Sequence, residues 1–480
     1  MNLVLSLLLY MGLNPGPGWA RAGTVLAAGA AGEALTLARS IEIALENNPA
    51  VIQAKDALEL ALSKEREAER AFKPGVSLEA GLDASSPELG SGVTNSGARV
   101  TISLRDVLLT GKYIGRSSLE VENARLDVEN ARRTLAEARE VTKYAVLSAY
   151  IDVLKAERSL DLAELSLKQA RVAFADAQAR KEVGNATEAD ILDARQAVGK
   201  AEAILSTAKS KLEMAHSRFN QTLGRELDIP VHLASDLSYK PAQVNLDELI
   251  SYAFEHKAEI RRARDDLAKG QLALEKTIEA SKPVVTIRGG YVDDRWSAGL
   301  DLASPDWNLA WRITATHVEG DVGQASSPGA KGLPDSSLDA REVKGWYAGV
   351  GLSWAPFDGG VSRERRLQAG INLKQLERAV SIQETSAILA IREAYYAFQA
   401  AGDAVASSDL GVNQAQEALR VMRLRYEAGL ATDRDLAAGE LGLSRAQVDR
   451  AFAVYDYVLA RAALERAAGR PIDIQGLPER

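Results

Sequence analysis

Apolar and small residues recur at alternating steps of three and four along two long stretches of the chain. The first stretch runs from about residue 113 to 182 without a proline. Its apolar positions are Val121, Ala124, Val128, Ala131, Leu135, Ala138, Thr142, Ala145 and Ala149. The second repeats the seam in phase at Ala369, Leu373, Leu376, Val380, Gln383, Ala387, Ala390 and Ala394. Such heptad seams predict long helices packed along one face, each a rod of about 100 Å.

A period of two replaces the helical period after a first helical segment predicted over residues 34–72, which ends before Pro74. Alternating apolar residues follow at Val76, Leu78, Ala80 and Leu82, and again at Val100, Ile102 and Leu104. A stretch rich in Gly, Ser, Pro and Asn separates the two runs. Period-two alternation is typical of a strand with one apolar face, so we predict a β-hairpin over about residues 75–106.

A second strand region, about residues 284–355, is longer. The first predicted strand has alternating apolar residues at Val285, Ile287 and Tyr291. The returning strand has them at Trp346, Ala348, Val350, Leu352 and Trp354. A third alternating stretch lies between them at Leu309, Trp311, Ile313 and Ala315. One extra strand would leave the chain on the wrong side of a membrane. We therefore predict a hairpin with an inserted loop over residues 293–342; the other interpretation is an added strand pair.

Tryptophan is concentrated in this second strand region, which holds five of the six tryptophans of the chain. Aromatic residues on alternating strands collect at membrane–water interfaces. The predicted membrane-interface aromatics are Trp307, Trp311, Trp346 and Trp354. The alternative is a soluble hairpin that packs on its aromatic residues.

Each long helix ends in a short turn motif. Gly184 suits a left-handed C-cap, and Thr187 stands at an N-cap position with Asp190 three residues later, an acidic variant of the capping box. The same arrangement returns at Gly429, Thr432 and Asp435. We predict helical tips at about residues 182–190 and 427–435, with returning helices over about 188–223 and 433–468.

The turn motifs belong to a duplication of most of the chain. The segment KEVGNATEADIL at 181–192 returns as YEAGLATDRDL at 426–436, an offset of 245 residues, whereas the offset upstream of the strands is 209. This predicts a first structural repeat over residues 33–223, a linker over 224–245, a second repeat over 246–470 and a C-terminal tail over 471–480. A duplicated unit of this kind buries its apolar face against its copies.

Composition narrows the class of protein. Alanine, leucine and charged residues dominate, as in long helices, and the net charge of −8 offers no general basic surface for nucleic acid. The absence of cysteine excludes disulfides and a lipid-bearing N-terminal cysteine. The apolar run at residues 3–13, followed by the small-x-small sequence Ala20-Arg21-Ala22, predicts a signal peptide over residues 1–22. The alternative is a disordered tail or a misplaced start.

The sequence offers no catalytic constellation. Its four histidines, His216, His232, His256 and His317, have no companion at metal-ligand spacing. Thr110-Gly111-Lys112-Tyr113 lacks the upstream glycine of a phosphate loop. We expect no enzyme activity, no cofactor and no bound metal.

Taken together, the chain resembles the TolC family of outer-membrane efflux and secretion ducts over essentially its whole mature length. The resemblance rests on ALENNP at 44–49, PFDGG at 356–360, the two turn motifs and their order. It implies a mainly α fold of two tandem repeats, each helix, β-hairpin, long helix, helix. Three copies would share a twelve-stranded transmembrane β-barrel joined to a twelve-helix α-barrel.

The resemblance also implies a function and partners. The homotrimer would lie in the outer membrane, in contact with its lipid, and extend into the periplasm. It would be a passive, porin-like channel of a tripartite efflux or type I secretion system. Its partners would be a periplasmic adaptor (membrane fusion) protein and an inner-membrane transporter of the RND, ABC or MFS type. Neither the substrate nor the identity of these partners can be read from the sequence.

Site residues follow from the same resemblance. Asp435 occupies the place of a family aspartate that rings the periplasmic aperture, while the place of a second falls on Ala438. In the first repeat Asp190 and Asp193 hold both places. The alternative is that Asp190 and Asp435 only start helices.

The remaining implied residues lie around the turns. The adaptor would dock at the tips, on Val183, Gly184, Thr187, Ala428, Gly429 and Thr432. Arg425 and Tyr426 would contribute contacts of a closed state, although the first repeat has Arg180 and Lys181 there. The competing hypothesis for the whole protein is a soluble periplasmic coiled-coil adaptor or tether.

Overall fold

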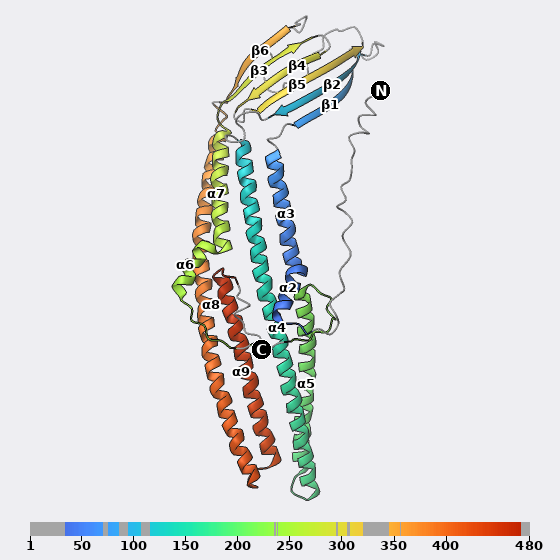
Figure 1. Cartoon of the computed structure of the whole chain (residues 1–480), viewed down its shortest axis with the longest axis vertical. Coiled ribbons are helices and arrows are strands. Elements are labelled where there is room, and N and C mark those ends of the chain that lie inside the picture. Colours follow the sequence, from blue (N-terminus) through green and yellow to red (C-terminus); the bar gives the residue numbers. More distant parts are fainter. Residues whose placement is uncertain are drawn as a thin grey trace.

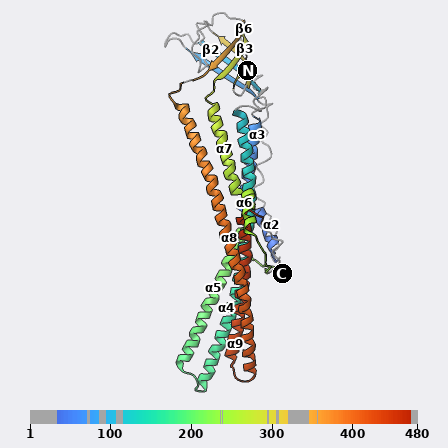
Figure 2. The same ribbon diagram turned by 90° about the vertical axis from the view of Figure 1, so that its left-hand side faces the viewer.

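The computed structural model describes residues 34–70, 75–85, 95–106, 116–234, 237, 239–293, 296–304, 308–319, 345–355 and 357–471. The predicted signal peptide, Trp307 and all of the C-terminal tail after Pro471 lie outside these residues. Figure 1 shows an elongated molecule with a β-sheet at one end and two helical tips at the other. Turned by 90°, the same body is narrow (Figure 2).

Two 67-residue helices, α4 (Arg116–Glu182) and α8 (Val361–Glu427), run most of the length of the molecule. Each turns back into a shorter helix, α5 (Glu188–Leu223) or α9 (Asp433–Ala467). Among the described residues, no helix combines the length and the apolar content needed to cross a membrane.

The first helical segment of each repeat is broken, so the prediction of one helix over residues 34–72 is wrong. Helix α2 (Leu37–Asn47) gives way to α3 (Pro49–Arg70), with Asn48 in an extended conformation. Proline at 49 explains this break, because the residue before proline avoids helical angles. Helices α6 (Leu246–His256) and α7 (Ala258–Glu279) break in the same way at Lys257. The second break has no proline, so tertiary packing maintains it.

The packing at each break involves a glycine at the end of the returning helix. Gly224 caps α5 with φ +71°, and a Cβ there would lie 2.4 Å from the carbonyl oxygen of Asn47. Gly469 follows α9 with φ +72°, and a Cβ there would lie 3.2 Å from Cα of Lys257. Only glycine permits both the left-handed angle and this close approach.

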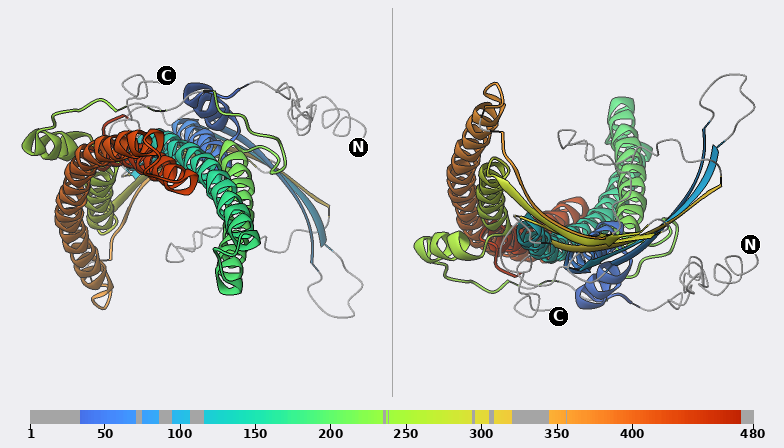
Figure 3. Two further views of the ribbon diagram at one scale, coloured as in Figure 1. Left: turned by 90° about the horizontal axis from the view of Figure 1, so that it is seen from below. Right: turned by 90° about the horizontal axis from the view of Figure 1, so that it is seen from above.

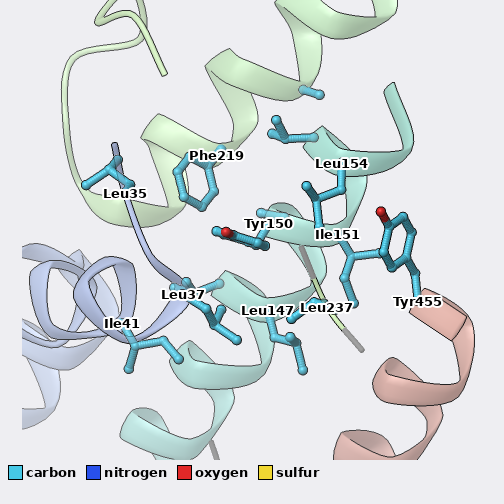
Figure 4. Packing of buried hydrophobic residues seen from close by; sticks show 14 of the residues in the cluster. Leu35, Leu37, Ile41, Leu147, Tyr150, Ile151, Leu154, Phe219, Leu237 and Tyr455 are labelled. Atoms are coloured by element: carbon cyan, nitrogen blue, oxygen red, sulfur yellow. The ribbon is translucent and has the colours of Figure 1, made fainter. Parts of the chain in front are cut away.

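The largest apolar core lies at this level and joins the two repeats. Tyr150 of α4 and Phe219 of α5 are buried edge to face, with ring centroids 6.1 Å apart. Leu37 of α2 packs beside them, and Tyr455 of α9 reaches in from the second repeat, near Ile151 (Figure 4). Burial of these large side chains fixes the middle of the molecule.

Above this core the repeats meet through charges instead. Helices α4 and α7 carry four ion pairs along their antiparallel contact: Arg133–Asp265, Arg262–Glu137, Lys269–Asp127 and Lys276–Glu120. Lys276 and Lys269 of α7 are seven residues apart, as are Glu120 and Asp127 of α4. The ion pairs therefore form a ladder with the heptad period, beside the buried apolar residues Val121, Val128 and Leu135 of α4.

Among the described residues, six antiparallel strands form one sheet. They are β1 (Gly75–Ser85), β2 (Asn95–Asp106), β3 (Val284–Val292), β4 (Trp296–Ala303), β5 (Asn308–Glu319) and β6 (Gly345–Ser353). Their order across the sheet is β1-β2-β5-β4-β3-β6. Seen from the ends of the molecule, the sheet and the helices follow one curved wall (Figure 3).

The predicted hairpin over residues 75–106 is present as β1 and β2. The inserted loop predicted over residues 293–342 is wrong, because β4 and β5 lie within it. The sequence analysis predicted the β5 stretch but not β4, although Trp296, Ala298, Leu300 and Leu302 of β4 alternate with Ser297, Gly299 and Asp301. Two added strands, unlike one, return the chain to the correct side of the sheet.

Candidate functional site: the helical tips and the two-faced sheet

The turn between α4 and α5 is built by one glycine and one capping box. Gly184 takes φ +81° just after α4, and the amide of Asn185 donates to the carbonyl of Arg180 at 2.7 Å. Thr187 Oγ1 accepts from the amide of Asp190, while Asp190 Oδ2 accepts from the amide of Thr187 at 2.7 Å. These hydrogen bonds from Thr187 hold the pKa of the Asp190 carboxyl below its usual value.

The turn between α8 and α9 repeats this geometry. Gly429 takes φ +71°, and Thr432 and Asp435 form the second capping box, with 2.9 Å from the Thr432 amide to Asp435 Oδ2. The Thr432 hydrogen bonds lower the pKa of Asp435, and the positive charges of Arg434 and Arg180 lower it further. Both predicted capping boxes are thus confirmed.

A second contact crosses each turn, and the sequence did not reveal its partners. Lys181 forms an ion pair with Glu188 in the first turn. At the equivalent places in the second turn, a hydrogen bond to Asp433 and the charge of Asp433 raise the pKa of Tyr426. An ion pair in the first turn and a hydrogen bond in the second therefore connect the same two positions of the repeat. The sequence did carry a signal for these partners: Glu188 and Asp433 are related by the 245-residue offset of the duplication, and both are acidic.

The other predicted tip residues lie on the open surface. Val183 is 70% exposed, and Leu430, beside Gly429, is 78% exposed. Asp193 is exposed one turn after Asp190, with Ala438 at the matching place of α9. The carbonyl of Arg425 accepts from the amide of Leu430 at 2.7 Å, so Arg425 shapes the turn through its backbone. The tips thus present apolar and acidic groups to solvent.

Helix α8 carries two apolar stripes on different faces. One is buried inside the chain and consists of Ile391, Phe398, Val405, Val412 and Leu419 at steps of seven. The other, which we call the open stripe, is exposed and consists of Ile382, Leu389, Tyr396, Leu410 and Leu424, with Asp403 and Glu417 at the two remaining heptad positions. Residues 389 and 391 differ by about 200° around a helix of 3.6 residues per turn. The open stripe therefore has the same heptad period but no covering helix among the described residues.

A groove near the tip lies between α8 and α9. It has a volume of about 390 Å³ and is lined by Gln416, Leu419, Arg420, Arg423, Leu424, Glu427 and Leu443. Its leucine floor and arginine rim combine apolar and charged surface. Arg423 reaches Glu440 of α9 at 3.8 Å, so one rim residue also links the two helices.

The sheet has one apolar and one polar face. On the apolar face, Tyr291 of β3 pairs with Trp346 of β6, and its ring contacts those of both Trp346 and Trp296, with centroids 5.3 Å apart in each case. Trp346 and Trp354 bracket the exposed residues Val350 and Leu352 of β6. Eight residues of strand separate the two tryptophans, about 26 Å at 3.3 Å per residue, close to the apolar band of a membrane barrel.

Of the predicted interface aromatics, Trp346 is 85% exposed and Trp354 is also exposed. Trp311 lies in β5, paired in register with Leu104 of β2 and Leu300 of β4. Tyr291 and Trp296 complete an aromatic cluster that the sequence analysis did not assign to the interface. The strand register, which brings them together, could have been read only after β4 was recognised.

The opposite face of the sheet carries charges. Asp301 of β4 lies 3.6 Å from Arg288 of β3 and 3.9 Å from Arg312 of β5. These side chains alternate with the apolar ones along each strand, so the two faces separate cleanly.

The passage from β6 to α8 uses the FDGG sequence. The Asp358 carboxylate accepts from the amides of Gly360 and Ser362 at 3.1 and 2.8 Å. Together with the Ser362 hydroxyl, these bonds lower the pKa of Asp358. Gly359 and Gly360 both have positive φ in open space, so the backbone angle alone requires glycine there.

The described residues thus form a two-faced antiparallel sheet carried on long helices. The outer membrane efflux protein family model matches residues 40–225 and 314–470. The chain therefore belongs to the outer membrane efflux protein family, a family of channels.

Known relatives agree with this assignment. The chain is 24% identical over 331 residues to outer membrane efflux protein BepC of Brucella suis biovar 1 (strain 1330), covering 68% of this chain and 63% of BepC. The match thus spans less than two thirds of that relative's length.

Solved structures share the fold. A CusC structure superposes with a TM-score of 0.66 at 15% identity, covering 90% of this chain and 92% of CusC. The outer membrane protein VceC of Vibrio cholerae gives 0.64 at 18% identity, covering 91% and 97%. The open-state MtrE outer membrane channel of Neisseria gonorrhoeae gives 0.65 at 18% identity, covering 91% and 89%. At these identities the likeness concerns the fold.

Proposed function

We propose that three copies of this chain form a passive duct through the outer membrane that carries substrates across the periplasm to the exterior. In this proposal the duct is the outer component of a tripartite efflux or type I secretion system. An inner-membrane transporter of the RND, ABC or MFS type supplies the substrate, and a periplasmic adaptor protein joins the two. The chain itself catalyses no reaction.

The observation that carries this proposal is the open stripe of α8. A heptad row of exposed leucine, isoleucine and tyrosine costs free energy in water and is typical of a helix with a missing neighbour. The buried stripe of α8 is already used within the chain. A neighbouring copy would supply the second partner.

The two lateral edges of the molecule make such a neighbour possible. Helix α8 and strand β6 lie along one edge, and α3, α5 and strand β1 lie along the other (Figure 1). The second edge also exposes apolar residues, including Ile52, Leu60, Ile204 and Met214. Two different edges in contact give a head-to-tail interface, which closes into a ring when the rotation fits. The curvature in Figure 3 is compatible with such closure.

The sheet provides the membrane part of the proposal. Its apolar face, with aromatics at both ends of β6, would meet lipid, and its charged face would line the pore. The helices would then extend into the periplasm.

The tips would form the periplasmic entrance. Asp190, Asp193 and Asp435, repeated by threefold symmetry, would concentrate cations at the aperture. Tyr426 and Arg425 would help to hold a closed state, for which the Tyr426–Asp433 hydrogen bond is a candidate contact. Val183, Gly184, Thr187, Ala428, Gly429 and Thr432, with the groove between α8 and α9, would receive the adaptor.

The test is the mass of the protein extracted from outer membranes in detergent, measured by size exclusion with light scattering. We expect a trimer, and we expect Leu389→Asp with Leu410→Asp to yield monomers. The control is Ala397→Asp, which adds a charge at an exposed position about 100° away from the open stripe on the same helix and should remain trimeric. A wild-type monomer that is soluble without detergent would refute the duct and favour a periplasmic adaptor or tether.

A further inference from the structure

The inserted hairpin β4–β5 occupies the middle of the sheet, not its surface. Strand β5 pairs with β2 on one side over 11 positions and with β4 on the other over 8. Strand β4 in turn pairs with β3 over 7 positions. The hairpin therefore separates β2 from β3, the strands that would otherwise be neighbours. Removing it would expose the backbone edges of both.

Side chains fasten the hairpin to the rest of the sheet. The ring of Tyr347 of β6 lies over glycines of the next two strands. A Cβ on Gly290 of β3 or on Gly299 of β4 would come within 2.7 Å of the Tyr347 hydroxyl. Asp301 of β4 faces arginines of β3 and β5 on the same face. An aromatic ring over glycines is a device that fixes strand register.

The turn end of the hairpin is also held by specific bonds. The amide of Ser304, after β4, donates to the carbonyl of Val285 at 2.8 Å, and the Ser304 hydroxyl accepts from the amide of Val285 at 2.8 Å. These bonds join the end of β4 to the start of β3. The turn end of the hairpin is therefore level with the start of β3.

Both faces continue through the added strands. In register across the sheet, Ile313, Ala298, Tyr291 and Trp346 form one row on the apolar face. Arg312 and Gly299 lie in a row on the polar face. A hairpin folded away as a loop would have no reason to keep this alternation.

We infer that β4 and β5 belong to the wall of the membrane pore, so that three copies with six strands each enclose a barrel of eighteen strands. This inference rests on the proposed trimer. An even number of strands per copy places β6 antiparallel to β1 of the next copy, so the ring closes without a mismatch. At a strand spacing of about 4.8 Å and a tilt of about 40°, a barrel of twelve strands has a diameter of roughly 24 Å, and a barrel of eighteen strands has a diameter of roughly 36 Å. The exit pore is then half as wide again and admits bulkier cargo.

Engineered disulfides test the strand order directly, because the natural chain contains no cysteine. Thr101 of β2 pairs with Thr314 of β5, and paired Cα atoms of antiparallel strands are within disulfide reach. In T101C/T314C we expect oxidation to consume both thiols in the trimer. The matched control T101C/V292C joins β2 to β3 at positions in one row of the sheet, linked through Thr314 and Ser297. These positions would be adjacent only if the hairpin were outside the wall. This variant should keep both thiols.

The reverse pattern, with T101C/V292C oxidised and T101C/T314C free, would overturn the inference. Electron cryomicroscopy of the trimer supplies an independent measure. Eighteen strands support the inference, and a trimer with twelve strands overturns it while leaving the duct intact. Failure to find any trimer removes the proposed function itself, so the two results cannot be confused.

Discussion

At the scale of single residues, glycines with the same backbone angle carry different costs. Gly184 has φ +81° with open space around it, whereas a Cβ on Gly224 would meet the backbone of Asn47. We expect Gly184→Ala to cost about 1–2 kcal/mol, the penalty of the left-handed conformation. Gly224→Ala should cost several times more, because the break between α2 and α3 must also move. Thermal unfolding of both variants measures the difference; equal costs would show that the close approach does not matter.

The capping aspartates give a pH dependence of definite sign. The pKa values of Asp190 and Asp435 are lowered from 3.8 in the folded state. The folded protein thus binds fewer protons than the unfolded chain in this range, and the caps stabilise it fully above about pH 3.8. Their contribution is lost as the pH falls through the lowered folded values.

This dependence can be isolated by substitution. In Thr187→Val with Thr432→Val, the backbone amides, which lower these pKa values most, remain, and the threonine hydroxyls, the second cause, are gone. We therefore expect weaker acid sensitivity at the tips between pH 5 and about pH 2. Hydrogen exchange of the amides of α5 and α9 near the turns reports it. An unchanged acid response in the double variant would contradict the role of the caps.

At the scale of elements, the ion-pair ladder between α4 and α7 should be uneven. Arg133 and Asp265 have side chains 19% and 18% exposed, whereas Lys276 and Glu120 are largely exposed. Exposed pairs contribute at most about 1 kcal/mol, while loss of one partner of a shielded pair costs up to about 3 kcal/mol. We expect a larger coupling energy for Arg133–Asp265 in a double-mutant cycle of unfolding. Equal coupling for the two pairs would show that burial does not set their strength.

The elements also show where local pattern suffices. The heptad pattern predicted α4 and α8, because each helix buries a stripe of apolar residues along its own length. The capping-box motifs predicted the starts of α5 and α9, because the threonine and the aspartate of each box are only three residues apart in the chain. The break at Lys257 has no local signal, since it depends on Gly469, more than two hundred residues later. Strand β4 was missed, and the partners of its Gly299 and Asp301 in β3, β5 and β6 appear only from the register of the sheet.

At the scale of the whole molecule, assembly should depend on α8 more than on any other helix. The open stripe continues the period of the buried one, so single charges along it should weaken association in proportion to their number. We expect Leu389→Asp alone to make the trimer dissociate at a higher protein concentration than the wild type, without lowering the helix content. Dilution in detergent, followed by light scattering and circular dichroism, separates these effects. Loss of helix content would show that the residue supports the fold of the single chain instead.

The sequence by itself determined the duplication, the long helices, the turns with their caps and the first hairpin, because each depends on residues close together in the chain. It also carried the resemblance to a family of outer-membrane ducts, to which the chain belongs. Only the tertiary structure decided the helix breaks, the ion-pair ladder, the open stripe and the six-stranded order of the sheet. These depend on which distant segments meet, and the pattern of one segment does not specify the surface that it will face.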